Sequence, residues 1–285
     1  MACVFPGSSA TRIQTVHGFL RCGMATALLL AGTLAAQTAP SDVMAPNPLA
    51  GACDALVAGT PHSDALSKVC QFSLTLPQRM PNFRCEQKTL RSVDDLPIDV
   101  ITAIVTYVNG TESYQELASR GQSVSSTNLL GAGTWSTGQF GGDLRATFNG
   151  SNKVSFHYLS EGKLGNRRAL IFQYRVAHQD VPAWQLQVAP QVVAPPYHGR
   201  LWVDESTGIL LQFEAVTDEL PLGFPMSNAE LQIAYKDVPF GDGTSFVLPF
   251  RSVVSGDYRD GAHNRNVIEF HNCHKFRATA RILPE

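Results

Sequence analysis

The chain has 285 residues, of which 44% are hydrophobic and 16% are charged, as in an ordinary globular protein with a sizeable core. The low charged fraction favours an all-β fold, because every second residue of a strand that faces the core must be apolar. With 22 basic and 24 acidic residues, the net charge of −2 gives no electrostatic reason to expect nucleic acid or an anionic membrane surface as a partner.

The first 36 residues have the pattern of a secretory signal peptide. Arg12 and Arg21 form a basic region, and residues 23–36 are a short apolar run that ends in small residues suited to signal peptidase. The run is too short to span a bilayer securely, and no cysteine directly follows it, as a lipoprotein would require. We therefore expect residues 1–36 to be removed and the mature protein to be periplasmic or secreted. Its net charge becomes 20 − 24 = −4, because only two arginines and no acid are lost.

Export makes disulfides the expected state of the cysteines that remain. Cys53, Cys70, Cys85 and Cys273 allow three pairings. Closeness in the sequence favours Cys53–Cys70, and Cys85–Cys273 would tie the first strand to the last. The alternative is that the cysteines are buried free thiols. For Cys53 and Cys70 we prefer the disulfide to this alternative, and for Cys85 and Cys273 we rate the two equally.

Two helical segments are expected before the strands begin. Residues 37–62 are rich in Ala, Pro, Thr and Gly, and we interpret them as a linker with one short helix around residues 52–57. An amphipathic helix is predicted over residues 63–76, with Ser63 at its N-cap and Asp64 in its first turn. Pro77 is expected to end this helix.

From residue 83 the chain consists of runs of strand-forming residues, most of them separated by turns that contain glycine. Many short strands without long helices between them predict an antiparallel meander. The eleven runs are 83–93, 98–109, 112–118, 153–160, 168–177, 183–189, 198–203, 209–216, 228–238, 245–255 and 265–276.

The clearest hairpin spans residues 197–216, with a turn at residues 204–208 that Gly208 closes. Alternation predicts Ile209, Leu211 and Phe213 on one face of the second strand. The acids of the turn are interpreted as turn residues rather than as catalytic groups.

Residues 129–149 interrupt the meander with five glycines, followed by a short predicted helix over residues 142–148. A loop of this length is uncommon in a compact domain and is often a lid or a binding segment. It lacks the Gly-Lys-Ser/Thr ending of a phosphate-binding loop, so nucleotide binding is not expected.

No motif for catalysis, metal binding or a cofactor rises above background. In His271-Asn272-Cys273-His274, strand alternation lets at most two ligands converge, whereas zinc needs three or four. Gly-x-Ser-x-Gly is absent, and the Ser-x-x-Lys match at residues 160–163 crosses a predicted turn. We expect no enzyme, cofactor or metal site. A catalytic pair assembled in space remains the alternative.

The apolar face of the predicted sheet is the remaining candidate for function. A single sheet of about eleven strands cannot bury that face alone, and few helices are available to cover it. Incomplete cover of a concave apolar face leaves a ligand cavity. This hypothesis fails if the protein's own side chains fill the face. The alternative is an interaction or sensor module of the cell envelope, which a large exposed apolar patch would favour.

Two stretches resemble the outer-membrane lipoprotein-sorting superfamily, the LolA- and LolB-like proteins. Residues 76–87 begin with Leu-Pro and end with Pro-Asn-Phe-Arg-Cys-Glu-Gln, and residues 201–211 contain Leu-Trp-Val-Asp followed by Thr-Gly-Ile-Leu-Leu. The resemblance spans roughly residues 63–278. Within this superfamily, the chain more narrowly resembles exported bacterial proteins that share Pro-x-Phe-x-Cys and a glycine-rich element like residues 136–141.

The resemblance implies a mainly β fold over residues 63–285, a single domain in which an antiparallel open half-barrel of about eleven strands is capped by short α-helices. It also implies a concave face that holds acyl chains, with a lipid, a lipidated protein or a hydrophobic small molecule as partner and a peripheral association with the cell envelope. The candidate ligand-binding residues are Phe172, Tyr174, Trp202, Leu211 and Phe213. Trp202 has the opposite parity to Leu201 and Val203 in its strand.

Overall fold

The computed structural model describes residues 48–125, 134–150, 152–180, 184–188, 190–240 and 242–276. The predicted signal peptide and the first part of the predicted linker lie outside these residues.

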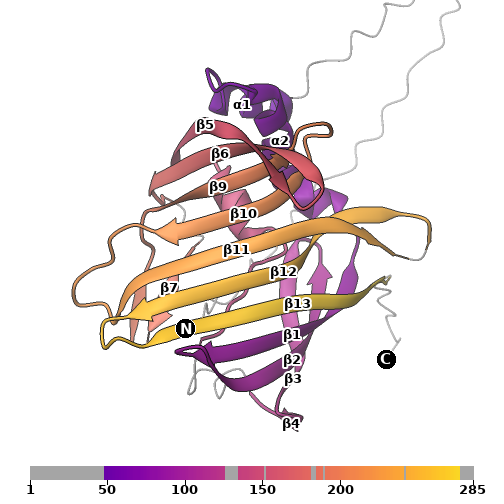
Figure 1. Cartoon of the computed structure of the whole chain (residues 1–285). Coiled ribbons are helices and arrows are strands. Elements are labelled where there is room, and N and C mark those ends of the chain that lie inside the picture. Colours follow the sequence, from indigo (N-terminus) through magenta and orange to yellow (C-terminus); the bar gives the residue numbers. More distant parts are fainter. Residues whose placement is uncertain are drawn as a thin grey trace, which may run out of the picture. The chain divides into compact units, whose positions relative to one another are not determined.

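Eleven strands form one antiparallel sheet in the order β4-β3-β2-β1-β13-β12-β11-β10-β9-β6-β5 (Figure 1). Strands β4 and β5 are its two edges, so the sheet remains open and the predicted fold class is confirmed. The strands are β1 Phe83–Val93, β2 Leu96–Val108, β3 Thr111–Ser119, β4 Gln122–Ser123, β5 Lys153–Leu164, β6 Arg167–His178, β9 Tyr197–Asp204, β10 Leu210–Thr217, β11 Met226–Pro239, β12 Ser245–Tyr258 and β13 His263–Lys275.

One predicted strand lies outside this sheet. The run predicted at residues 183–189 contains β7 (Leu186–Val188), which pairs with β8 (Gln191–Val193) in a separate two-stranded sheet. Prolines at positions 190, 195 and 196 flank β8, and proline has no backbone N–H to donate to a longer ladder. The short edge strand β4 was not predicted.

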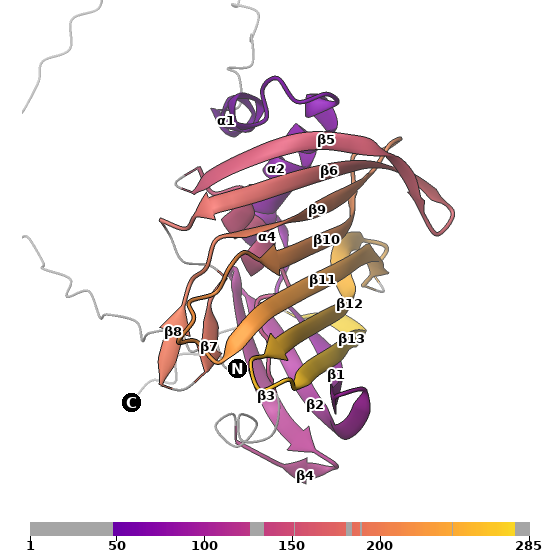
Figure 2. The ribbon, with the colours of Figure 1, turned by 60° about the vertical axis from the view of Figure 1, so that its left-hand side comes forward.

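Three helices are described: α1 Pro48–Leu56, α2 Ser63–Arg79 and α4 Gly142–Thr147. Helices α2 and α4 lie behind the sheet in Figure 1, on the face that we call the inner face (Figures 1 and 2). Two predicted details of α2 are wrong. His62, with a left-handed φ of 56°, occupies the N-cap instead of Ser63. The helix also continues through Pro77, whose ring packs against Gly110, a residue without a Cβ to obstruct it.

The strand register divides the inner face into an apolar half and a polar half. On the apolar half, one row joins Ile233, Phe213, Leu201, Phe172 and Tyr158 across neighbouring strands. The polar half belongs to β1, β12 and β13, and it contains the buried side chains of Gln87, Thr89, Arg91, Ser252, Asn264 and Asn266. The hydrophobic core lies under β5, β6, β9, β10 and β11 and continues under the neighbouring strands through Phe83, Tyr107, Leu248 and Phe270.

At Gly199, a hydrogen bond between β6 and β10 passes close over the backbone of β9 and links three strands of the apolar half. The Tyr174 hydroxyl donates a 2.7 Å hydrogen bond to the backbone oxygen of Glu214, and β9 passes between these two residues at Gly199. A Cβ at Gly199 would lie 1.8 Å from that oxygen. Only glycine fits this position.

Two disulfides are present, in the two pairings that the sequence favours. Cys53–Cys70 joins α1 to α2 across 17 residues, and Cys85–Cys273 joins β1 to β13 across 188 residues. The second bond links the first and last long strands of the sheet, which are also hydrogen-bonded neighbours.

Candidate functional site

The inner face is covered by the segment of residues 134–148, which we call the crossing segment. Its aromatic rings contact both halves of the sheet: Trp135 lies 5.7 Å from Tyr114, and Phe148 stacks on Phe156 at 5.2 Å. Between them, Phe140 lies 4.7 Å from Phe270. The loop predicted from its glycines is thus a cover over the sheet.

This cover and α2 fill the predicted concave cavity around three of the candidate ligand-binding residues. Phe172, Tyr174 and Phe213 are fully buried, at 0% exposure. Tyr174 stacks on Phe213 at 5.7 Å, and Phe172 meets the ring of Tyr158 at 5.8 Å. In this conformation they belong to a closed core.

The other two candidates do not share the inner face with these residues. A bulge between Leu210 and Gln212 makes Leu210 pair with Val203, so Leu210, and not Leu211, shares the face of Phe213. The alternation predicted for this strand is wrong for that reason. Trp202 pairs with Gln212 and donates a 3.2 Å hydrogen bond from Nε1 to Glu214 on the outer face.

Open space remains beside α2, in a groove with a volume of about 350 Å³. One wall is a stripe of α2 side chains at positions i, i+4, i+8 and i+11, which share one face of a helix. The opposite wall comes from the turn between β9 and β10 and from the adjacent ends of β11 and β12. The lining residues are Lys68, Phe72, Leu76, Arg79, Met80, Thr207, Gly208, Ile209, Leu210, Asp237, Ser245, Phe246 and Val247. We call this site the α2 groove.

The turn that forms part of this groove is rigid. The carboxylate of Asp204 accepts hydrogen bonds from the backbone N–H and hydroxyl of Ser206 and of Thr207, at 2.6–3.1 Å, and from Nε of Arg167 at 2.7 Å. Burial opposes ionisation of Asp204, but these bonds outweigh it and lower its pKa below the usual range. The turn therefore holds its shape around an ionised carboxylate, as its sequence predicts.

Helix α2 is fixed on the opposite side of the groove. Its buried stripe, which includes Leu66, Val69 and Leu76, packs into the core, and the Cys53–Cys70 disulfide ties it to α1. Phe72 stands outside that stripe and is half-buried. An apolar residue beside the buried stripe is a sequence signal for this groove. The predicted ligand residues did not include it.

A second titratable cluster lies under the crossing segment. Glu112 accepts hydrogen bonds from the backbone N–H of Phe140 at 2.9 Å, the backbone N–H of Gly138 at 3.2 Å and the Tyr114 hydroxyl at 2.8 Å. Asp143, at 8% exposure, accepts no such bond from the described residues. Burial raises the pKa of both groups, and the charge of Glu112 raises that of Asp143 further. We interpret Glu112 as the hydrogen-bond acceptor that fixes the crossing segment, and Asp143 as the member of the pair whose pKa is raised further.

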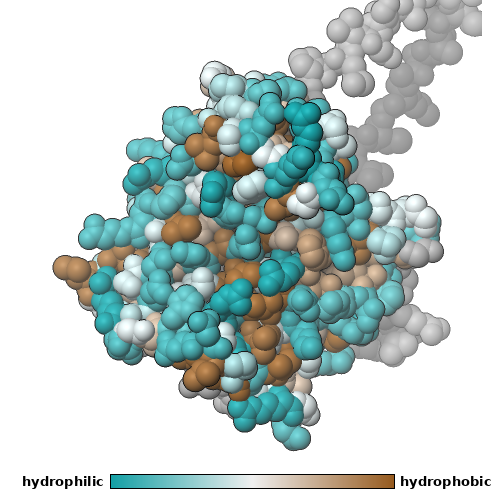
Figure 3. Space-filling model, in the orientation of Figure 1, coloured by the Kyte–Doolittle hydropathy of each residue, from teal (hydrophilic) through white to brown (hydrophobic). Residues whose placement is uncertain are grey.

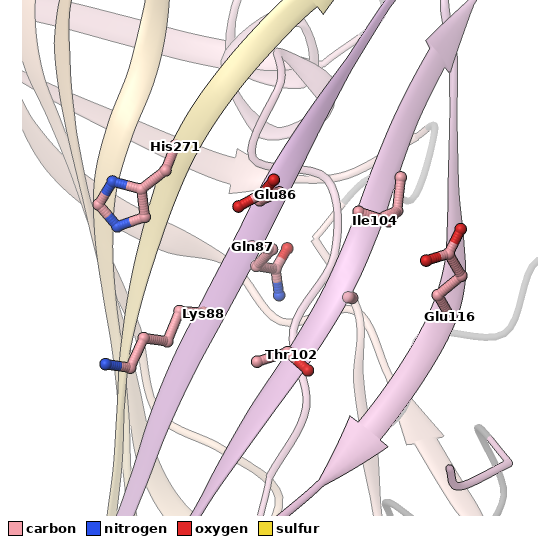
Figure 4. A pocket seen from close by; sticks show the side chains of 8 residues that line it. Glu86, Gln87, Lys88, Thr102, Ile104, Glu116 and His271 are labelled. Atoms are coloured by element: carbon pink, nitrogen blue, oxygen red, sulfur yellow. The ribbon is translucent and has the colours of Figure 1, made fainter. Parts of the chain in front are cut away.

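The outer face of the sheet carries a hollow of about 340 Å³ over β1, β2, β3 and β13 (Figure 4). It lies where Glu116, with a positive φ of 52°, interrupts the register between Thr102 and Ile104. Its lining combines the polar side chains of Glu86, Lys88, Glu116 and His271 with the apolar side chains of Ala103 and Ile104.

Apolar side chains on the outer face are scattered among hydrophilic ones, with a gathering near the middle of the view (Figure 3). The register places Val100, Leu90, Val267 and Val253 in one row on the outer face. Leu90 is 40% exposed and the valines are half-buried.

Within the described part of the chain, no group of three or more His, Cys, Asp or Glu side chains could hold a metal ion. Cys273 is committed to its disulfide, so it is not available beside His271 and His274. None of the described helices is long and apolar enough to cross a membrane.

No protein-family model and no curated protein matches the chain. Among solved structures, the chain is similar to a LolA superfamily protein from Nitrosomonas europaea, with 14% identity, a TM-score of 0.36 and 75% of this chain and 94% of that chain covered. It is also similar to a loop-deletion mutant of OmpT, an outer membrane protein of Vibrio cholerae, with 10% identity, a TM-score of 0.20 and 67% and 98% covered. Both TM-scores are below 0.5, so neither likeness supports a conclusion about function.

Proposed function

We propose that this protein is an exported, non-enzymatic binder of a single-chain amphiphile, whose acyl chain lies in the α2 groove. The observation that carries this proposal is the groove itself. Phe72, Leu76 and Met80 face Leu210, Phe246 and Val247 across about 350 Å³ of open space. Ligand sites in proteins have volumes of roughly 300–1,000 Å³ and mainly apolar walls. The volume is at the lower end of that range, which favours one chain rather than a whole diacyl lipid.

The inner face enters this proposal as an extension of the groove. Leu76 and Leu210 belong both to the groove and to the core that contains Phe172, Tyr174 and Phe213. A longer chain would reach these three residues only by displacing side chains of the crossing segment. The short-chain ligand is therefore the one that the groove accepts without rearrangement.

A groove-filling variant tests the proposal. Val247→Trp adds an indole to the wall of the groove, and we expect it to weaken binding of glycerol monolaurate at least about tenfold, as measured by isothermal titration calorimetry. The matched control is Val192→Trp, because Val192 is 53% exposed on β8 and does not line the groove. Equal affinities of both variants and the unmodified protein would contradict the groove as the binding site, and so would an absence of binding to the unmodified protein.

A further inference from the structure

We infer that the ligand of the α2 groove carries an anionic head, bound at the end of the groove where Lys68 lies; this inference rests on the proposed function. Lys68 and Arg79 are eleven positions apart on α2, so they lie on the same face, about 16 Å apart along the helix axis. Phe72 and Leu76 lie between them. The groove is thus an apolar stripe with a cation at each end.

Neither cation forms an ion pair with any of the described carboxylates. The other cations near the groove differ in this respect. Arg167 pairs with Asp204 at 2.7 Å. Lys275 lies over the ring of Phe246 and pairs with Asp242 at 2.9 Å. A cation without a partner at the mouth of an apolar groove favours an anionic ligand.

The two ends of the groove are not equivalent. Lys68 lies at one end, beside the β9–β10 turn, whose lining residues Thr207 and Gly208 carry no charge. Asp237, the acid of the lining, pairs with Val247 across the β11–β12 ladder, on the wall that Ser245 and Phe246 continue. The uncharged turn beside Lys68 gives the ligand a direction: head at Lys68 and tail toward Met80 and Phe246.

The turn also lies against the side chain of Lys68. Gly208 has a φ of +73°, and a Cβ at this position would lie 2.7 Å from Cδ of Lys68 and 3.7 Å from its Nζ. The aliphatic stem therefore passes closely over the turn, because glycine leaves the space open, and the ammonium group reaches solvent at the groove mouth.

Three ligands with the same acyl chain test the inference: laurate (anionic), glycerol monolaurate (neutral) and lauroylcholine (cationic). We expect the unmodified protein to bind laurate about two- to fivefold more tightly than glycerol monolaurate, the effect of one partly exposed ion pair, and lauroylcholine most weakly. The measurement is isothermal titration calorimetry in about 0.05 M salt, because screening reduces the preference at high salt.

Variants of single cations locate the head. Lys68→Gln should remove the preference for laurate over glycerol monolaurate, and Lys68→Glu should reverse the preference in favour of lauroylcholine. Lys163→Gln, on the exposed edge strand β5, is the matched control and should keep the preference. Equal binding of laurate and glycerol monolaurate would overturn the inference while the proposed function stands. So would a preference that survives in Lys68→Gln and is lost in Arg79→Gln. Failure of all three ligands to bind would overturn both.

Discussion

Replacing Cys85 and Cys273 together with alanine is expected to lower the free energy of unfolding by about 5 kcal/mol. The bond closes a loop of 188 residues, and in the chain-entropy model a loop of this length restricts the unfolded chain by about that amount. Urea denaturation of the oxidised protein and of the double variant measures the difference.

The second disulfide supplies the matched control for this prediction. Cys53–Cys70 closes 17 residues, so the same model gives about 3 kcal/mol for the paired substitution Cys53→Ala and Cys70→Ala. A larger loss from the Cys53–Cys70 variant than from the Cys85–Cys273 variant would show that loop length does not set the stabilisation.

Substituting Asp143 with asparagine is expected to raise the free energy of unfolding at pH 8. Burial and the charge of Glu112 hold the pKa of Asp143 well above its usual value. Above about pH 4 the folded protein therefore binds a proton more tightly than the unfolded chain does, and stability decreases as pH rises through the folded pKa. Asparagine keeps the shape of the side chain and removes this cost.

The pH dependence of unfolding, measured between pH 5 and pH 9, distinguishes this explanation from a simple packing effect. The unmodified protein should lose stability toward pH 9, and the Asp143→Asn variant should show a flatter profile. Asp95→Asn, a substitution in an exposed turn, is the control and should leave the profile unchanged. Parallel profiles for Asp143→Asn and the unmodified protein would exclude Asp143 as the titrating group. Asp99 and Asp204 do not contribute to the pH dependence in this range. Their pKa values are lowered, so they take up protons only in more acidic solution.

Much of the sheet could be predicted because local sequence determines it. Apolar alternation and glycine turns located ten of its eleven strands, and β1 was predicted at its observed bounds, Phe83–Val93. The bulge at Leu210–Gln212 could not be seen in this way. A bulge depends on how β10 meets β9, and a one-residue slip changes the face of every later side chain.

The α2 groove could not be predicted from the sequence for a different reason. Its walls come from residues 68–80, 207–210 and 237–247, which meet only after the sheet has curved around α2. The sequence does show the cation at each end of the apolar stripe, Lys68 and Arg79. Which turn or strand would face that stripe follows from strand order, and the predicted meander differs from the observed order, in which β1 pairs with β13 and β4 and β5 are the two edges.

The two acids under the crossing segment illustrate the same limit. Glu112 occupies a position typical of an exposed strand residue, and Asp143 occupies the first turn of a short helix, where an acid is common. Only the packing of α4 against the inner face brings the two carboxylates together under the crossing segment. The resulting shift in pKa is a property of the tertiary structure.

The most direct test of the α2 groove as an acyl-chain site is photo-crosslinking with a lauric acid analogue that carries a diazirine in its chain, followed by peptide mass spectrometry. We predict crosslinks to α2 at Phe72, Leu76 or Met80 and to the opposite wall at residues 208–210 or 245–247. Excess unlabelled laurate should suppress them. Crosslinks confined to other parts of the chain, or labelling that laurate does not compete away, would contradict the proposal.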